Sequence, residues 1–167
     1  MRGTAFVLLA ALCACGPAPR ATGPATFRDP TAQLASKADF DAARFAGTWH
    51  EVARFPGTRG CPGGRLRLDP AGPAALAQTT TCPDGSVEAA RLDVAPFGRL
   101  TLVEAAGSAP LWVLWTDASY RTAVVVAPGG TGGRILDRAP ASAPDRLRAA
   151  REVLDFNGFD ADRLQAP

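Results

Sequence analysis

Few residues in this chain are suited to acid–base or nucleophilic chemistry. The 167-residue sequence contains a single histidine, His50, and its serines, among them Ser86 and Ser119, lie in or beside predicted turns with no base in reach. A serine nucleophile needs a positioned base, most often histidine, so the sequence does not support a catalytic triad. Glu51 and Asp117 could act as a pair of carboxylates, but buried carboxylates are usually neutralised by arginine. We expect binding rather than catalysis, with no cofactor and no metal site.

Two of the four cysteines, Cys61 and Cys82, flank a predicted hairpin. Their midpoint falls at the centre of Pro70-Ala71-Gly72-Pro73, which places them opposite each other on adjacent strands. Facing residues of an antiparallel pair bring their Cα atoms to about 5 Å, a distance that a disulfide spans. We predict a disulfide between these two residues, formed in an oxidising compartment. A redox-active pair and a metal site are the alternatives, and the absence of a Cys-x-x-Cys spacing disfavours both.

The first residues have the composition of a signal peptide, predicted here as residues 1–14. Arg2 gives a positive start, and residues 6–12 form an apolar run that is shorter than the roughly 20 residues of a membrane span. The ending Leu12-Cys13-Ala14-Cys15 resembles a bacterial lipobox, which implies cleavage before Cys15 and acylation of its thiol. Gly16 implies, by the same resemblance, the outer membrane of a Gram-negative cell, with the protein facing the periplasm. Plain secretion is the alternative.

The rest of the chain divides into two parts by composition. Residues 15–38 are rich in Pro, Ala, Thr and Gly and poor in large apolar residues, so we predict a flexible tether behind the acylated Cys15. Residues 39–167 are long enough for one domain with a core. The formal net charge is +2 and the basic residues are scattered, which argues against nucleic acid as a partner.

Beyond residue 39 the sequence alternates between short strands and turns rich in Gly and Pro. The predicted strands are 48–55, 65–68, 75–81, 87–94, 99–103, 111–116, 121–127 and 134–138. Strands at such regular spacing indicate an antiparallel sandwich or an up-and-down barrel. One amphipathic helix follows, with Ser142 or Ala143 as its cap, Pro144 in its first turn and Asn157 at its end, and we expect it to pack outside the sheet.

Three motifs in this region resemble those of the lipocalin family. Gly47-Thr48-Trp49 resembles the family's Gly-x-Trp at the head of the first strand. Thr116-Asp117-Ala118-Ser119-Tyr120 resembles its Thr-Asp-x-x-Tyr between strands six and seven, and Arg138 its arginine at the end of the last strand. Together with the lipobox, the resemblance is to bacterial lipocalins of the outer-membrane lipoprotein type. It implies an all-β fold, an eight-stranded antiparallel up-and-down β-barrel with a C-terminal α-helix packed outside.

The motif residues are expected to be structural. Trp49 can plug the closed end of the barrel, where its large aromatic surface is buried. Arg138 is predicted to stack on that indole in a cation–π contact of about 1 kcal/mol, and Gly47 to allow close backbone approach. The remaining motif residues, on the turn at the same end, are Thr116, Asp117 and Tyr120.

Alternation along the strands predicts which side chains line the cup. With Trp49 and Arg138 fixed inward, alternation predicts Glu51, Ala53, Phe55, Arg134 and Leu136 as ligand-binding residues. The resemblance implies that Leu111, Val113 and Trp115 on the sixth strand also face the cup. Apolar walls with few polar groups suit an amphiphile whose chain is buried and whose head group lies near the mouth. Arg134 is predicted to pair with a phosphate or carboxylate head group. The alternative is that it only extends into solvent.

The sequence therefore predicts binding, storage or transport of a lipid or other small hydrophobic ligand, such as a fatty acid or lysophospholipid. Affinity would come mainly from burial of apolar surface, at about 25 cal/mol per Å². The alternative is a structural or protein-binding envelope lipoprotein, because small eight-stranded barrels can be filled by their own side chains.

Overall fold

The computed structural model describes residues 26–167, so the predicted signal peptide, Cys15 and the first part of the predicted tether lie outside the described residues. Eight strands close into one barrel in which each pairs antiparallel with its neighbours in sequence and the last pairs with the first. The strands are β1 (Gly47–Arg54), β2 (Arg65–Pro70), β3 (Ala75–Thr81), β4 (Val87–Ala95), β5 (Arg99–Glu104), β6 (Gly107–Thr116), β7 (Thr122–Val126) and β8 (Gly133–Asp137). The predicted fold class is confirmed.

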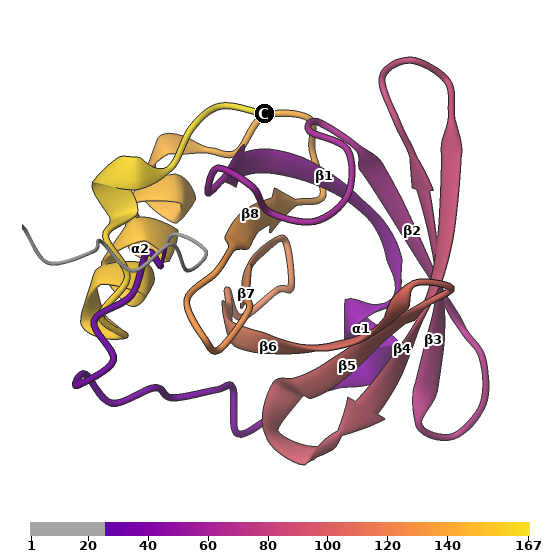
Figure 1. Cartoon of the computed structure of the whole chain (residues 1–167), viewed down its shortest axis with the longest axis horizontal. Helices are drawn as coiled ribbons and strands as arrows, with labels where there is room; N and C mark the ends of the chain where they lie inside the picture. The colour runs from indigo at the N-terminus through magenta and orange to yellow at the C-terminus, as the bar shows by residue number, and fades with distance from the viewer. Residues whose placement is uncertain (1–25) are drawn as a thin grey trace, which may run out of the picture.

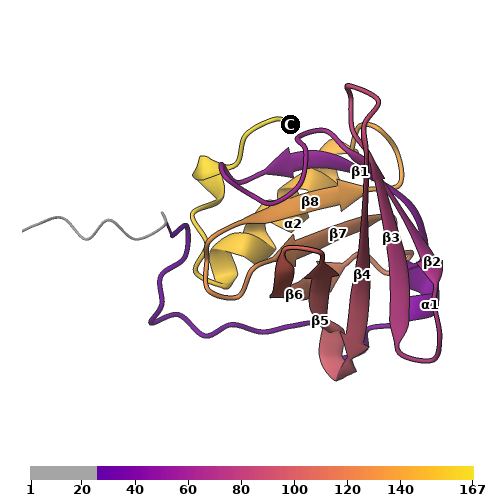
Figure 2. The ribbon, with the colours of Figure 1, turned by 45° about the vertical axis from the view of Figure 1, so that its right-hand side comes forward.

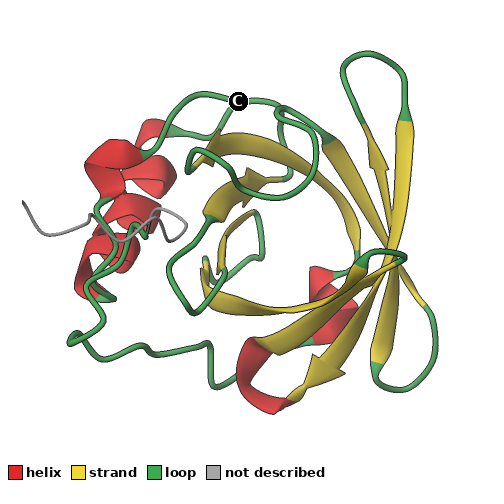
Figure 3. Ribbon diagram, viewed as in Figure 1, coloured by secondary structure: helices red, strands yellow, loops and turns green. Residues whose placement is uncertain are grey.

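The helices lie beside the wall of this barrel or at one of its ends. They are α1 (Ala42–Phe45), η1 (Pro96–Gly98), α2 (Pro144–Phe156) and η2 (Ala161–Arg163). Figure 1 shows the strands as a ring with α2 beside it, and Figure 3 shows the same view by element type. Within residues 26–167, no helix combines the length and the apolar character needed to cross a bilayer.

Trp49 and Arg138 close one end of the barrel. The Trp49 side chain is fully buried, and its Nε1 donates to the Phe45 carbonyl at 2.8 Å. The Arg138 guanidinium lies 3.7 Å from the centroid of the Trp49 ring, which confirms the predicted stacking. Arg138 also donates to the carbonyls of Thr48, at 2.9 Å, and of Tyr120, at 3.1 Å. These contacts join β1, α1, β8 and the turn after β6.

The glycine before β1 is required by this arrangement. Gly47 has a φ of +101°, and a Cβ placed there would lie 3.0 Å from Nη1 of Arg138. Any other residue would therefore be strained in its backbone and would crowd the guanidinium. The turn after β6 is fixed by Asp117, which accepts from the Thr122 amide at 2.9 Å and from Nε of Arg121 at 2.9 Å. Thr116, just before it, is buried.

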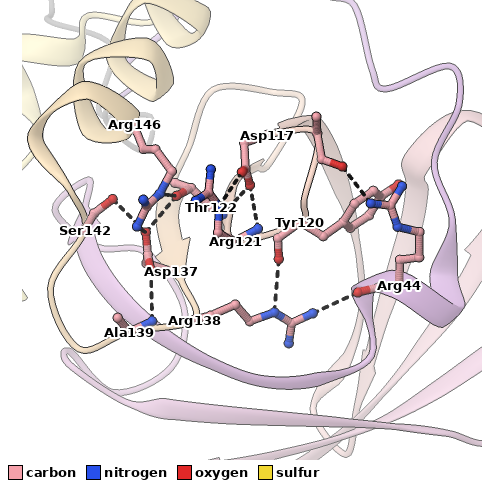
Figure 4. A network of polar contacts seen from close by, with 11 residues as sticks. Arg44, Asp117, Tyr120, Arg121, Thr122, Asp137, Arg138, Ala139, Ser142 and Arg146 are labelled. Carbon is pink, nitrogen blue, oxygen red and sulfur yellow. Dashed lines mark hydrogen bonds and ion pairs between the residues drawn. The ribbon is translucent and has the colours of Figure 1, made fainter.

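Helix α2 is joined to the barrel through a buried carboxylate on β8. Asp137 accepts hydrogen bonds from the hydroxyls of Thr122 and Ser142, each at 2.7 Å, and forms an ion pair with Arg146 of α2 at 3.2 Å. The Ala139 amide donates to its other oxygen at 2.9 Å. Figure 4 shows Asp137 at the centre of these contacts. Ser142 is engaged here, and the N-cap of α2 is Ala143, whose side chain makes no capping hydrogen bond.

Residues 26–38 lie against the barrel, so the prediction of a tether is wrong for this part of the chain. Phe27 is buried, stacks on Phe55 of the barrel wall at 4.9 Å between centroids, and donates its amide to the Gly130 carbonyl at 2.7 Å. Further along, the Lys37 amide donates to the Val113 carbonyl at 2.9 Å. The segment is ordered by partners distant in the sequence, which local composition does not reveal.

The Asp137 contacts predict a specific dependence of stability on pH. Burial raises the pKa of the Asp137 carboxyl, but hydrogen bonds from Ala139, Ser142 and Thr122 and from Arg146 outweigh it and hold the pKa below its usual range. Because the folded-state pKa is lowered, this stabilisation is present above the unfolded-state pKa of about 3.9 and is lost as the pH falls through the folded-state pKa. Asp137→Asn should lower the free energy of unfolding at pH 7 by about 3 kcal/mol, measured by urea denaturation.

Carboxylates with a lowered pKa titrate between roughly pH 5 and pH 1. As the pH falls through this range, Asp137→Asn should lose less stability than the wild type. Asp162→Asn is the matched control, because its side chain is 95% exposed, and it should change stability by under about 0.5 kcal/mol. Equal acid sensitivity of wild type and Asp137→Asn would contradict this account.

Candidate functional site

The barrel contains a cavity of about 400 Å³ that opens at the end away from Trp49. Its wall is formed by inward-facing apolar side chains of six strands, and Phe45 of α1 lies at its floor. These wall residues are Leu66, Leu92, Leu102, Leu111, Val125 and Leu136. The mouth is bordered by the loop between β1 and β2 and the loop between β7 and β8. The volume falls within the range of about 300–1,000 Å³ for small-molecule sites, so the barrel is not filled by its own side chains.

Near the mouth, one buried carboxylate faces two arginines. Oε1 of Glu51 lies 2.9 Å from Nη1 of Arg54, and Oε2 lies 3.2 Å from Nη1 of Arg134. The side chains are 0%, 8% and 13% exposed in that order. The three side chains together carry a net charge of +1, and the carboxylates of Glu88 and Glu104 also act electrostatically on Arg134. Burial lowers the pKa of the Arg134 guanidinium, and Glu51 opposes that effect, but arginine stays protonated in proteins.

The two arginines differ in how far their donors are used. Nη2 of Arg54 donates to the Thr58 carbonyl and, at 3.1 Å, to the Gly60 carbonyl. Arg134 donates to the Arg59 carbonyl and lines the cavity. The guanidinium of Arg134 has five N–H donors, so it can offer hydrogen bonds to a group that enters the cavity. We call Glu51, Arg54 and Arg134 the mouth cluster.

The loop between β1 and β2 reaches across the mouth. Nη1 of Arg59 in this loop lies 3.0 Å from Oε2 of Glu104, at the end of β5. Strands β1 and β5 are four positions apart around the barrel in either direction, so this ion pair joins opposite walls. The loop also contributes Gly57 and Thr58 to the cavity lining. The entrance is therefore partly covered by a segment whose position an exposed ion pair helps to hold.

The predicted disulfide is confirmed and lies at the open end. Cys61 and Cys82 are bonded, with their Cα atoms 5.8 Å apart. They are not direct partners in the hairpin, because the register pairs Arg65 with Thr81. Cys61 instead belongs to the loop before β2, and the bond fixes this loop to the turn after β3. Glu88 lies near the two sulfur atoms, but bonded cysteines offer no thiolates to a metal.

Strict alternation fails at two β-bulges, and three predicted ligand-binding residues are wrong as a result. On β1, Glu51 pairs with Leu136 and Ala53 with Ile135, so one extra residue lies between them. A bulge of this kind shifts the following side chains to the other face of the sheet. Ala53 and Phe55 consequently point outward, into the core between the barrel and α2.

The second bulge has the same effect on β6. Val113 pairs with Val125, Trp115 pairs with Val124, and one residue is again extra. Val113 stays inside the barrel, whereas Trp115 packs against the outer core with Val124. Bulges depend on how a strand fits its neighbours, and neither strand carries a glycine at the bulge that would have marked it in the sequence.

The other predicted ligand-binding residues face the interior. Leu111, Arg134 and Leu136 line the cavity, while Glu51 is buried beside Arg134 and Val113 lies in the inner core. Sequence reasoning missed the lining leucines of β2, β4 and β5, although the alternation Arg65-Leu66-Arg67-Leu68 signals an inward face on β2. It also missed the loop residues, for which the sequence carries no periodic signal.

The barrel is similar to solved lipocalin structures. Lobster apocrustacyanin A1 matches with a TM-score of 0.59 and 21% identity, over 75% of this chain and 78% of that chain. Apocrustacyanin C2 matches with a TM-score of 0.61 and 19% identity, over 83% of this chain and 92% of that chain. Insecticyanin from the tobacco hornworm Manduca sexta matches with a TM-score of 0.58 and 19% identity, over 86% of this chain and 88% of that chain. No family model matches the sequence, and no curated protein is significantly similar to it. At these identities the similarity establishes the fold.

The Arg59–Glu104 pair predicts how readily the loop across the mouth opens. Glu104→Gln should raise amide hydrogen exchange at residues 57–60 by up to about fivefold, because an exposed ion pair contributes at most about 1 kcal/mol. Added salt should speed the same exchange in the wild type and not in the variant. Arg67→Gln is the matched control, since it removes an exposed pair with Asp69 on the outer wall. Unchanged exchange in Glu104→Gln would show that the disulfide and the hydrogen bonds from Arg54 and Arg134 hold the loop without this ion pair.

Proposed function

We propose that this protein binds a small amphiphile with an anionic head group. One observation carries the proposal: an apolar cavity of about 400 Å³ has, near its mouth, one buried and one partly buried guanidinium with a buried carboxylate between them. An alkyl chain would lie against the leucine wall, and a carboxylate or phosphate would accept hydrogen bonds from Arg134. Charge-assisted bonds of this kind are stronger than neutral ones, and a planar guanidinium can hold such a group with two parallel bonds.

The charge of the mouth cluster distinguishes this ligand class from a neutral one. Buried charges are favourable only when they are paired, and Glu51 can fully balance only one of the two arginines. An incoming anion would supply the second negative charge at a point already shielded from water. Fatty acids and lysophospholipids with an anionic head have this combination of chain and charge.

We further propose that the protein is a lipid carrier held at the outer membrane, on the periplasmic side, by acyl chains on Cys15. The support is the lipobox-like sequence before that residue and the signal-peptide composition of residues 1–14. An oxidising compartment is consistent with the Cys61–Cys82 disulfide. Mass spectrometry of the N-terminal peptide tests the proposal, because acylation adds a fixed mass to Cys15 and uncleaved or plain secreted protein lacks it.

Binding is favoured over catalysis because the candidate catalytic carboxylates are already neutralised. Glu51 is paired with Arg54 and Arg134 in the mouth cluster, and Asp117 is paired with Arg121 at the closed end of the barrel. They therefore lie in different parts of the barrel and cannot act together on one substrate. His50 points away from the interior, because Trp49, the residue before it on β1, points inward.

Arg134→Gln should weaken binding of an anionic amphiphile far more than that of a neutral one. Loss of one charge-assisted interaction of about 1.5–3 kcal/mol corresponds to a roughly 10- to 100-fold higher Kd for a fatty acid. A fatty alcohol of the same chain length should change by less than about threefold. Isothermal titration calorimetry with both probes measures the difference.

The matched control for this experiment is Arg65→Gln. Arg65 is exposed at the start of β2, so this variant removes a positive charge near the open end without touching the cavity lining. Its Kd for the fatty acid should stay within about twofold of wild type, given the weakness of screened surface charges. Equal losses for acid and alcohol in Arg134→Gln would reject head-group recognition by Arg134 and leave the apolar cavity as the only determinant.

The finite cavity predicts a limit to chain length. Each methylene that enters the cup should lower Kd about fourfold, since its burial contributes about 0.8 kcal/mol. Once the cavity is filled, further methylenes should add nothing, so a plot of log Kd against chain length should bend to a plateau. A series of saturated fatty acids read by competition with a fluorescent fatty acid measures this. Failure of every chain length to compete would contradict the carrier proposal.

A further inference from the structure

We infer that the open end of the barrel faces the lipid bilayer, so that the mouth of the cup lies at the membrane surface. This inference deepens the proposed function and rests on it, because it takes Cys15 as the point of attachment. It concerns a different property, namely which end of the barrel the membrane contacts. Three observations on the described residues carry it.

The first observation is where the chain enters the folded structure. The Phe27 amide donates to the Gly130 carbonyl in the loop between β7 and β8, which borders the mouth. The Phe27 carbonyl accepts from the Asp160 amide at 2.8 Å. With its ring stacked on Phe55 at the open end of β1, Phe27 is fixed on three sides. The chain therefore enters the structure at the open end.

The second observation is the path of the chain after that point. From Phe27 the segment 26–38 runs along the outside of the barrel, and Figure 2 shows it passing from beside α2 toward α1. It reaches the closed end at Asp41, whose amide donates to the hydroxyl of Tyr120 at 2.9 Å. The whole length of the barrel thus separates residue 26 from the closed end. Ten residues lie between Cys15 and Thr26, and this link can span at most about 40 Å.

The third observation is the distribution of exposed apolar side chains. Three large hydrophobic residues are exposed in the described part of the chain: Phe156 at 82%, Val87 at 63% and Phe97 at 56%. Val87 begins β4 at the open end. Phe156 is the last residue of α2. Two residues later, the Gly158 carbonyl accepts a hydrogen bond from the amide of Asp29, which lies next to the entry point. Only Phe97 lies at the closed end, in the connection between β4 and β5.

Together these features favour a bilayer as the partner of the open end. The link to the attachment point joins the structure at this end, and two apolar side chains stand where they could enter the interfacial region of the membrane. With the mouth in that position, a lipid could move between the bilayer and the cavity with little exposure of its chain to water, which is the costly step for an apolar chain. The closed end, with its floor of Trp49 and Arg138, would face away from the membrane.

Fluorescence quenching by lipids tests this orientation directly. The acylated protein is placed in phosphatidylcholine vesicles that contain a lipid with a quencher on its head group. A dye is attached to a single new cysteine, either Ala106→Cys in the turn between β5 and β6 at the open end or Ala71→Cys in the turn between β2 and β3 at the closed end. Both sites are exposed. We expect at least twofold stronger quenching at residue 106, and equal or stronger quenching at residue 71 would overturn the inference.

Apolar substitutions provide a matched set of variants for the same measurement. Val87→Ser combined with Phe156→Ser should bring the ratio of quenching at the two sites toward one. Phe97→Ser removes a similar apolar surface at the closed end and should leave the ratio unchanged. If the ratio of quenching at residue 106 to quenching at residue 71 instead rises with Phe97→Ser, the closed end contacts the membrane and the inference is overturned.

A second preparation separates failure of the inference from failure of the proposed anchor. A chain that starts at residue 16 behind six histidines is held on vesicles that carry nickel-chelating lipids, and the same two dyes are read. If Cys15 proves not to be acylated, the proposed attachment in cells fails, whereas this preparation still reports which end meets a membrane near residue 16. Quenching that favours residue 106 here supports the inference, and quenching that does not overturns it.

Discussion

The structure depends on one contact, the guanidinium of Arg138 on the indole of Trp49. The contact is 3.7 Å from guanidinium carbon to ring centroid, and its energy alone is modest, about 1 kcal/mol. Its effect is larger because Arg138 also binds backbone carbonyls from α1, β1 and the turn after β6. One side chain therefore closes the floor and fixes the position of four segments. With the floor sealed in this way, the barrel can leave a cavity at its other end.

The two β-bulges let one sheet serve two cores. Inside the barrel the side chains are mostly leucines around a cavity, and outside β1 and β6–β8 they pack against α2 and the N-terminal segment. A strand with perfect alternation could not present two successive apolar residues to the same outer core. The bulges on β1 and β6 make this possible, and they turn Ala53, Phe55 and Trp115 away from the cup. Part of the predicted cavity wall is thereby used to hold the helix.

Charge is distributed unequally between the two ends of the barrel. At the closed end, Asp117 and Asp137 each receive several hydrogen bonds, and burial is outweighed so that the pKa of each carboxyl lies below its usual range. At the open end, the three side chains of the mouth cluster carry one more positive than negative charge, although Glu88 and Glu104 also act on Arg134. A balanced network stabilises a fold, whereas an incompletely balanced one beside a cavity can bind an anion. This difference is the main reason to look for ligand at the mouth.

The sequence by itself determined the positions of the strands, the outer helix and the disulfide pair, and the resemblance of its motifs to those of lipocalins implied the barrel and the contact of Trp49 with Arg138. These features follow from local signals, namely turns rich in Gly and Pro, apolar periodicity, cysteine placement and short motifs with fixed spacing. Only the tertiary structure decided that residues 26–38 pack on the barrel, that two bulges reverse the alternation, and that Arg54 joins Arg134 at Glu51. Each of these depends on segments far apart in the chain meeting in space, and the periodicity of a single strand carries no information about its distant neighbours.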